Sequence, residues 1–135
     1  MDLTFTQCFV HVHDPDRALA FYRDVLGLEL RHDVAREEYR WITVGAASQP
    51  DVNIVITNYL NGSPADRDAI AALVAKGALG GLHFRSDDVD ATFETVRAAG
   101  AEIVQEPTDQ FWGTRDFAVR DPSGNLVRID QPPAG

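Results

Sequence analysis

The chain carries an internal repeat whose two copies lie about 74 residues apart. The first copy spans Asp14–Leu30 and the second spans Asp88–Ile103. The matched positions are Asp14 with Asp88, Asp16 with Asp90, Leu19 with Phe93, Tyr22 with Val96 and Arg23 with Arg97. After a gap of one residue, Gly27 matches Gly100. Two similar units that each bury one face tend to pack as a pair. The repeat therefore predicts two half-domains that enclose a cavity, where function would be located.

Length and charge narrow the class of protein. A chain of 135 residues is long enough for one domain with its own core. Its 21 acidic and 12 basic residues give a net charge of -9, which argues against nucleic acid or an anionic membrane as partner.

The single Cys8 lies in an apolar run, which predicts a buried structural thiol. With no membrane-length apolar run and no signal-peptide pattern, we expect a cytoplasmic protein.

Hydrophobic spacing gives each copy the order βαβββ. In the first copy we expect strands over 5–12, 28–34, 39–44 and 52–59, and a helix from an Asp14 cap to Gly27. In the second we expect strands over 80–85, 101–105, 115–120 and 126–130, and a helix over 89–99. The copies occupy about 1–60 and 80–133 of a single domain. A connector over 61–79 with a helix over 65–76 joins them. The class is α+β, with the repeats forming a curved mixed sheet around a cavity.

Three segments carry a resemblance to a known family. They are His13–Leu30, Ser86–Glu102 and Trp112–Ile129. Through them the whole chain resembles the vicinal oxygen chelate superfamily, which groups glyoxalase I, bleomycin-resistance proteins and extradiol dioxygenases. The last segment is most similar to bleomycin-resistance proteins, which are acidic dimers that sequester the drug without a metal. The resemblance implies a glyoxalase-like fold, but this fold hosts enzymes and silent binding proteins alike.

The same resemblance locates four cavity-facing positions that hold a divalent metal in the enzymes of the family. Here these positions are Gln7, Val55, Gly81 and Arg128. Valine and glycine have no side-chain donor, and arginine is a fixed cation. A divalent ion needs at least three protein donors. We therefore expect no metal site and no cofactor.

A rearranged site is the alternative. Gln7, His11 and His83 share the cavity face of their strands by alternation. They could hold a metal for a lyase or dioxygenase, or supply a histidine base for a metal-free isomerase. The simpler interpretation is that both histidines are polar residues of the cavity wall.

Aromatic and basic residues replace the metal ligands on the cavity face. Alternation places Phe9, Tyr39, Trp41 and Tyr59 inward, with Trp112 at the mouth of the second unit, and Arg85 and Arg128 add positive charge that Asp116 and Asp130 could neutralise. This mixture suits a flat, conjugated ligand with a polar or anionic group, although Trp41 could equally be packing. The candidate ligand-binding residues are Gln7, Phe9, His11, Trp41, Val55, Tyr59, His83, Arg85, Trp112 and Arg128.

These observations predict a metal-independent protein that binds a small planar compound, with antibiotic sequestration as one such role. The alternatives are a metal-dependent lyase or dioxygenase with the rearranged site, or a partner-binding subunit that uses 61–76. Two βαβββ units leave sheet edges open, so we also expect a homodimer.

Overall fold

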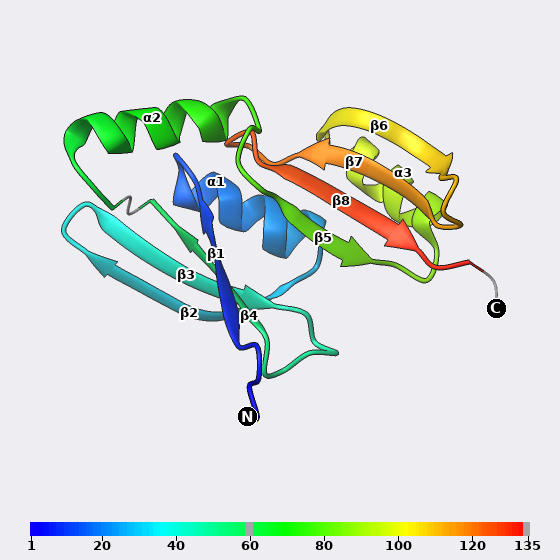
Figure 1. The fold of residues 1–135 in the computed structure, drawn as a ribbon, viewed down its shortest axis with the longest axis horizontal. Helices are drawn as coiled ribbons and strands as arrows, with labels where there is room; N and C mark the ends of the chain where they lie inside the picture. Colours follow the sequence, from blue (N-terminus) through cyan, green and yellow to red (C-terminus); the bar gives the residue numbers. More distant parts are fainter. Residues whose placement is uncertain (59–60, 134–135) are drawn as a thin grey trace. The chain divides into compact units, whose positions relative to one another are not determined.

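The computed structural model describes residues 1–58 and 61–133, and over them the order βαβββ occurs twice (Figure 1). The first set consists of β1 (Gln7–His11), α1 (Pro15–Leu19) with its continuation η1 (Ala20–Val25), β2 (Glu29–Arg36), β3 (Tyr39–Gly45) and β4 (Asn53–Thr57). After α2 (Pro64–Ala75), the second consists of β5 (Leu82–Arg85), α3 (Val89–Ala98), β6 (Glu102–Asp109), β7 (Arg115–Arg120) and β8 (Leu126–Gln131). The expected α+β class is confirmed.

Each set of strands forms one mixed sheet with the same topology. Sheet A has the order β1-β4-β3-β2, and sheet B has the order β5-β8-β7-β6. The first strand of each set pairs parallel with the last, and the other pairs are antiparallel. The duplication in sequence is therefore a duplication of sheet topology. In the described residues neither sheet closes on itself, so β1, β2, β5 and β6 are edge strands.

The chain divides into two compact units, Met1–Ala72 and Leu73–Gly135. Unit 1 contains sheet A and unit 2 contains sheet B, while α2 crosses the boundary near its last turn. The expectation that the repeats form one domain around a cavity stays a prediction.

No helix among residues 1–58 and 61–133 is long and apolar enough to span a membrane. The cytoplasmic location stays a prediction.

Edge strand β6 extends further than the sequence indicates. The expected strand ends at Gln105, but β6 continues to Asp109 through Pro107. Proline lacks the N–H that a central strand must donate, whereas an edge strand tolerates it. Register shifts between Ile103 and Thr108 accommodate the irregular stretch.

The expected helix caps are present in both units. The Asp14 carboxylate accepts hydrogen bonds from the backbone N–H groups of Asp16 and Arg17, at 3.1 and 3.2 Å. In unit 2, Asp88 accepts one from the N–H of Ala91 at 3.1 Å. A side-chain acceptor at this position satisfies a backbone donor that the helix leaves unpaired. The matched aspartates of the repeat therefore begin equivalent helices.

A single inserted residue in the first copy is visible as a wider helical turn. The segment from Asp14 to Gly27 is one residue longer than its counterpart ending at Gly100. Near its end, the Leu26 N–H bonds to the Phe21 carbonyl, five residues back, at 3.0 Å. Such a turn takes up one extra residue without ending the helix. Both copies then end at a glycine with positive φ, 77° at Gly27 and 88° at Gly100.

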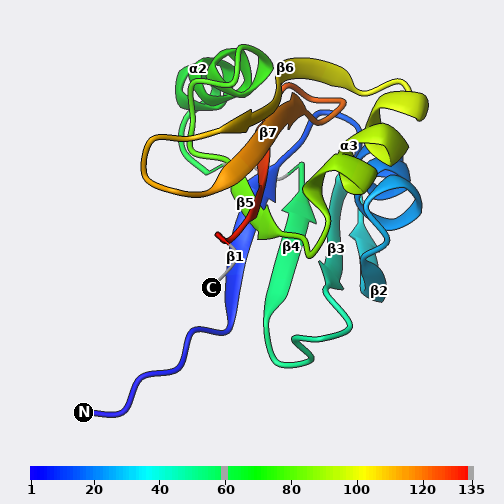
Figure 2. The same ribbon diagram turned by 90° about the vertical axis from the view of Figure 1, so that its right-hand side faces the viewer.

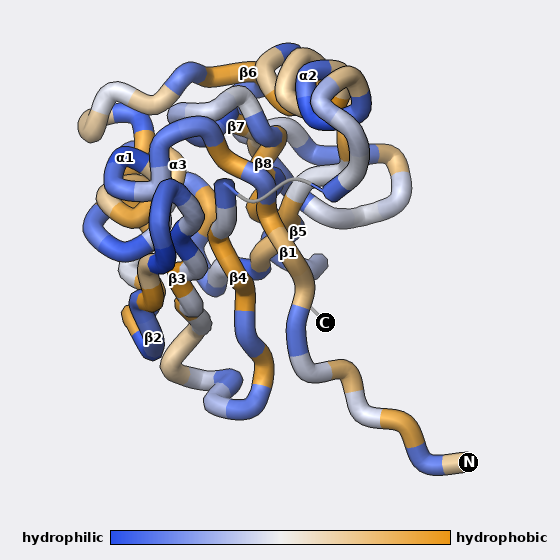
Figure 3. The backbone as a smooth tube through the Cα atoms, turned by 90° about the vertical axis from the view of Figure 1, so that its left-hand side faces the viewer, coloured by the Kyte–Doolittle hydropathy of each residue, from blue (hydrophilic) through white to orange (hydrophobic). Residues whose placement is uncertain are grey.

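Each unit buries the face of its sheet that its own helix covers. In unit 1, α1 packs against β3 and β4, and in unit 2, α3 packs against β6, β7 and β8. The buried side chains of unit 1 include Val10, Ala18, Leu19, Tyr22, Ile42, Val44, Ile54 and Ile56. Those of unit 2 include Val89, Phe93, Val96, Phe117, Val119, Val127 and Ile129. Figure 3 shows hydrophobic stretches along β4 and β8. Because successive strand side chains alternate, the neighbouring positions lie on the opposite, helix-free face of each sheet.

Candidate functional site

The helix-free face of sheet A contains the candidate residues of the first copy that the structure describes. Phe9 lies opposite Val55, and His11 lies opposite Thr57. Trp41 also lies opposite Thr57 on the other neighbour of β4. Directly paired strand residues point to the same side of a sheet. This face therefore consists of Gln7, Phe9, His11, Trp41, Thr43, Val55 and Thr57.

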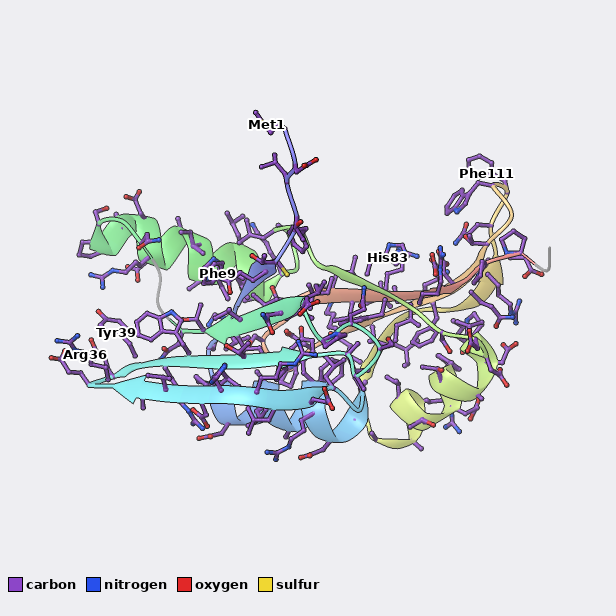
Figure 4. All side chains as sticks on the ribbon, turned by 90° about the horizontal axis from the view of Figure 1, so that it is seen from below. Met1, Phe9, Arg36, Tyr39, His83 and Phe111 are labelled. Atoms are coloured by element: carbon purple, nitrogen blue, oxygen red, sulfur yellow. The ribbon has the colours of Figure 1, made fainter. Side chains whose placement is uncertain are left out.

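This face is rich in aromatic and apolar surface. Phe9 is 54% exposed, and Figure 4 shows it on the side of sheet A away from α1. Trp41 is half-buried, and its ring lies 6.5 Å from that of Tyr39. Val55 is buried at the centre of the face. Rings held on a sheet face provide a stacking surface for a flat ligand. Tyr59 lies outside the described residues.

Unit 1 also has a surface pocket of about 250 Å³ lined by Glu38, Tyr39, Asn58 and Arg67. Asn58 forms its wall because its amide accepts from the Arg40 N–H and donates to the Glu38 carbonyl, both at 2.9 Å. The pocket brings Arg67 of α2 beside Tyr39. Sequence reasoning named neither Asn58 nor Arg67, since nothing in the pattern relates α2 to the β2–β3 hairpin.

The helix-free face of sheet B is polar. His83 lies opposite Arg128, and Asp130 lies between Arg85 and Asp116 in the strand register. Asp130 accepts from Arg85 Nε at 3.0 Å and from His83 Nε2 at 3.1 Å. Arg128 pairs with Asp116 at 3.2 Å. As expected from the sequence, each arginine is paired with an aspartate: Arg85 with Asp130 and Arg128 with Asp116. Figure 4 shows His83 on the side of sheet B away from α3.

Two glutamines complete the network around Asp116. Oδ1 of Asp116 accepts from Gln105 Nε2 and from Gln110 Nε2, each at 2.8 Å. Gln105 also accepts from Arg128 at 3.2 Å. The sequence pattern alone points to neither glutamine. Alternation with Ile103 could have placed Gln105 on this face, but the bulged register of β6 hides the pattern, and Gln110 lies beyond the strand.

Both aspartates are ionised at neutral pH despite their burial. Burial by itself raises the pKa of Asp116. Hydrogen bonds from Gln110 and Gln105 and the charge of Arg128 lower this pKa by more than burial raises it, so the net shift is downward. The pKa of Asp130 is also lowered, chiefly by its hydrogen bond from Arg85. Neither carboxylate is therefore suited to act as a general base near pH 7.

Trp112 lies in the loop between β6 and β7, next to an even more exposed ring. Phe111 is 96% exposed and Trp112 is 58% exposed, and their rings meet edge to face at 4.8 Å. A backbone hydrogen bond of 2.8 Å from Gln110 to Thr114 closes the loop. Large exposed aromatic surface of this kind is typical of binding sites.

The four metal positions of the related enzymes do not fit a divalent ion in this chain. Val55 is apolar, and Arg128 is a cation that already pairs with Asp116. A Cβ added at Gly81 would collide with the Leu126 carbonyl, so this position excludes any side chain. Among the described residues, no group of three or more His, Cys, Asp or Glu could hold a metal. The alternative metal ligands were Gln7, His11 and His83. The His83 ring is hydrogen-bonded to Asp130. The use of Gln7 and His11 as metal ligands stays a prediction.

We expect Gly81→Ala to lower the free energy of unfolding by about 1–3 kcal/mol, because the backbone of β8 must move to admit the methyl group. Gly80→Ala is the matched control, since no atom lies within 4 Å of its added Cβ. Urea denaturation measures both. Equal stability of the two variants would show that the close approach of Gly81 to Leu126 is not required.

The sequence model of the Glyoxalase/Bleomycin resistance protein/Dioxygenase superfamily matches residues 4–129. The chain belongs to this superfamily. The resemblance drawn from the repeat and the C-terminal motif is thereby confirmed.

Two solved structures are similar to this chain over almost its whole length. UcmS2 is 32% identical, with a TM-score of 0.86 over 96% of this chain and 98% of its own. TnmS3, described as an antibiotic binding protein from Streptomyces sp. CB03234, is 27% identical, with a TM-score of 0.74 over 97% of each chain. A curated relative from Vibrio cholerae, named probable lactoylglutathione lyase, is 29% identical over 90% of this chain and 86% of its own. The expected glyoxalase-like fold is confirmed, while these names span binding and catalysis.

Proposed function

We propose that this protein binds a small planar or aromatic compound without a metal ion and sequesters it, an antibiotic being one such ligand. The observation that carries the proposal is the replacement of metal donors at Val55, Gly81 and Arg128. Gly81 is the strongest of the three, because the nearby Leu126 carbonyl leaves no room for a ligating side chain.

The helix-free face of each unit, taken by itself, carries groups that such a ligand can use. Phe9 and Trp41 offer rings and apolar area on sheet A, and Arg85 and Arg128 offer hydrogen-bond donors on sheet B. Apolar walls with a few placed polar groups are typical of small-molecule sites. The antibiotic-binding description of TnmS3 supports the same class of ligand.

The direct test is a binding screen of planar compounds by calorimetry in buffer containing EDTA. The panel contains bleomycin, acridine, riboflavin and 2-acetylnaphthalene, the last serving as a reference probe. We expect at least one to bind with a stoichiometry of about one per chain and to be recovered unchanged. Failure of every compound to bind below about 1 mM, or conversion of the bound compound, would contradict sequestration.

A lyase is the second candidate, because the Vibrio cholerae relative carries that name. It requires a metal ion, for which the sequence alone suggests Gln7, His11 and His83 as ligands. The test is formation of lactoylglutathione from methylglyoxal and glutathione by protein supplied with Zn²⁺ or Ni²⁺. Turnover that disappears in the His83→Ala variant would favour the lyase over sequestration.

We further propose that the protein is a homodimer. The edge strands β1 and β5 have no neighbour on one side in the described residues. The segment before β1 exposes Met1, Leu3 and Phe5, and Figure 2 shows it extending away from the lower end of β1. Exposed edges with apolar neighbours favour pairing with a second chain. Sedimentation at micromolar concentration should give twice the chain mass of 14.9 kDa, and a monomer would contradict the proposal.

A further inference from the structure

On the helix-free face of sheet B, the carboxylate groups that accept hydrogen bonds are buried, and the side chains that donate to them are exposed to solvent. The carboxylates of Asp116 and Asp130 are only 2% and 11% exposed. The side chains bonded to them are more accessible, with exposures of 63% for Arg85, 57% for His83 and 31% for Arg128. A molecule approaching this face therefore meets N–H groups before it meets carboxylate oxygens.

Several of these N–H groups have no bond within the network. A guanidinium has five donors. The hydrogen bonds of Arg85 use its Nε and Nη2, and that of Arg128 uses Nη1. Among residues 1–58 and 61–133, the remaining donors of both arginines have no hydrogen-bond acceptor, and they can therefore bond to a ligand. Bonds from a charged donor contribute more than those between neutral groups.

The formal charge of the network is close to zero. Arg85 and Asp130 form one pair, and Arg128 and Asp116 form the other. A ligand therefore gains hydrogen bonds here without having to supply a full compensating charge. A cationic ligand, by contrast, meets the outer guanidiniums first and is repelled at short range. The net charge of -9 acts on cations over longer distances, where salt screens it.

We infer that the helix-free face of sheet B selects planar ligands that carry oxygen acceptors, such as carbonyl or phenolate groups, and that are neutral or singly negative. It rejects ligands whose polar group is a cationic amine. This inference rests on the proposed function and names its ligand class. Asp130 is a positioning residue in this scheme, since it holds Arg85 and His83 side by side.

The test uses four probes that share one ring system and differ in one substituent. They are naphthalene, 2-acetylnaphthalene, 2-naphthoate and 2-(aminomethyl)naphthalene. Titrations followed by NMR chemical shifts give each affinity and report whether the amides around His83 and Arg85 respond. We expect the ketone and the carboxylate to bind at least about fivefold more tightly than the amine.

Two matched variants locate the selectivity. Arg85→Met removes the most exposed guanidinium of the network and should reduce the advantage of the ketone over the amine to less than about twofold. Arg97→Met is the control. Arg97 is an exposed, ion-paired arginine of unit 2, but it lies on α3, and its replacement should leave all four affinities unchanged.

The outcomes separate this inference from the proposed function. If the amine binds as tightly as the ketone, or if Arg85→Met keeps the preference, the ligand class is wrong while binding of planar compounds stands. If no naphthalene probe binds, the ligand class is contradicted, and the proposed function is contradicted as well if bleomycin, acridine and riboflavin also fail to bind.

Discussion

Asp116→Ala is expected to lower the free energy of unfolding by about 3 kcal/mol. The substitution removes the acceptor of Gln105, Gln110 and Arg128 at once. Breaking a buried ion pair costs about 3–5 kcal/mol. We take the lower end because Arg128 is 31% exposed and water can partly replace its partner. Urea denaturation at pH 7 measures the difference.

Asp109→Ala is the matched control for this experiment. Asp109 also pairs with an arginine of unit 2, Arg115, but it is 83% exposed. Exposed ion pairs contribute about 0–1 kcal/mol, so the control should lose less than about 1 kcal/mol. Equal losses in the two variants would show that the network around Asp116 contributes nothing beyond a surface pair.

The stabilisation that Asp116 provides should depend on pH in a predictable direction. The pKa of Asp116 is lower in the folded protein than in an unfolded chain, where it is about 3.9. Its stabilising contribution is therefore complete above that value and is lost as pH falls through the folded pKa. The stability gap between wild type and Asp116→Ala should narrow as pH falls from 5 towards 2. A constant gap would contradict an ionised Asp116.

Trp41→Ala is expected to weaken binding of 2-acetylnaphthalene by about tenfold or more. Stacking on an aromatic side chain contributes about 1–3 kcal/mol to the binding of a flat base, and we expect a similar range here. Trp41 is half-buried on the helix-free face of sheet A, beside Tyr39. Calorimetric titration of the folded variant gives the change in affinity.

Trp41→Phe separates stacking from packing. It keeps a ring at the same position on β3 and should retain binding within about threefold of wild type. Urea denaturation of both variants measures how much Trp41 contributes to the free energy of unfolding. Unchanged affinity in Trp41→Ala would assign Trp41 to packing alone and would remove it from the ligand site.

The fold was predictable because the repeat and the helix signals agree. Aspartate caps at Asp14 and Asp88 and glycines at Gly27 and Gly100 fix the ends of both helices. Strand alternation then assigns the two faces of each sheet correctly, as the pairing of Phe9 with Val55 shows. The end of β6 was missed because Pro107 is a strand breaker in most contexts and is tolerated here only at a sheet edge.

The site was only partly predictable. Alternation placed Arg85 and Arg128 on one face, and their charges suggested the two aspartate partners that the structure provides. The roles of Gln105 and Gln110 depend on a bulged register and a loop, which no periodic pattern encodes. The exclusion of side chains at Gly81 depends on the distance between two strands, which the sequence does not contain.

The most direct test of metal-independent binding combines elemental analysis with titration. Protein purified without chelator is analysed for transition metals and then titrated with 2-acetylnaphthalene before and after treatment with EDTA. We predict less than about 0.1 equivalent of any transition metal per chain and the same affinity in both titrations. About one equivalent of metal, together with binding that EDTA abolishes and added metal restores, would contradict the account.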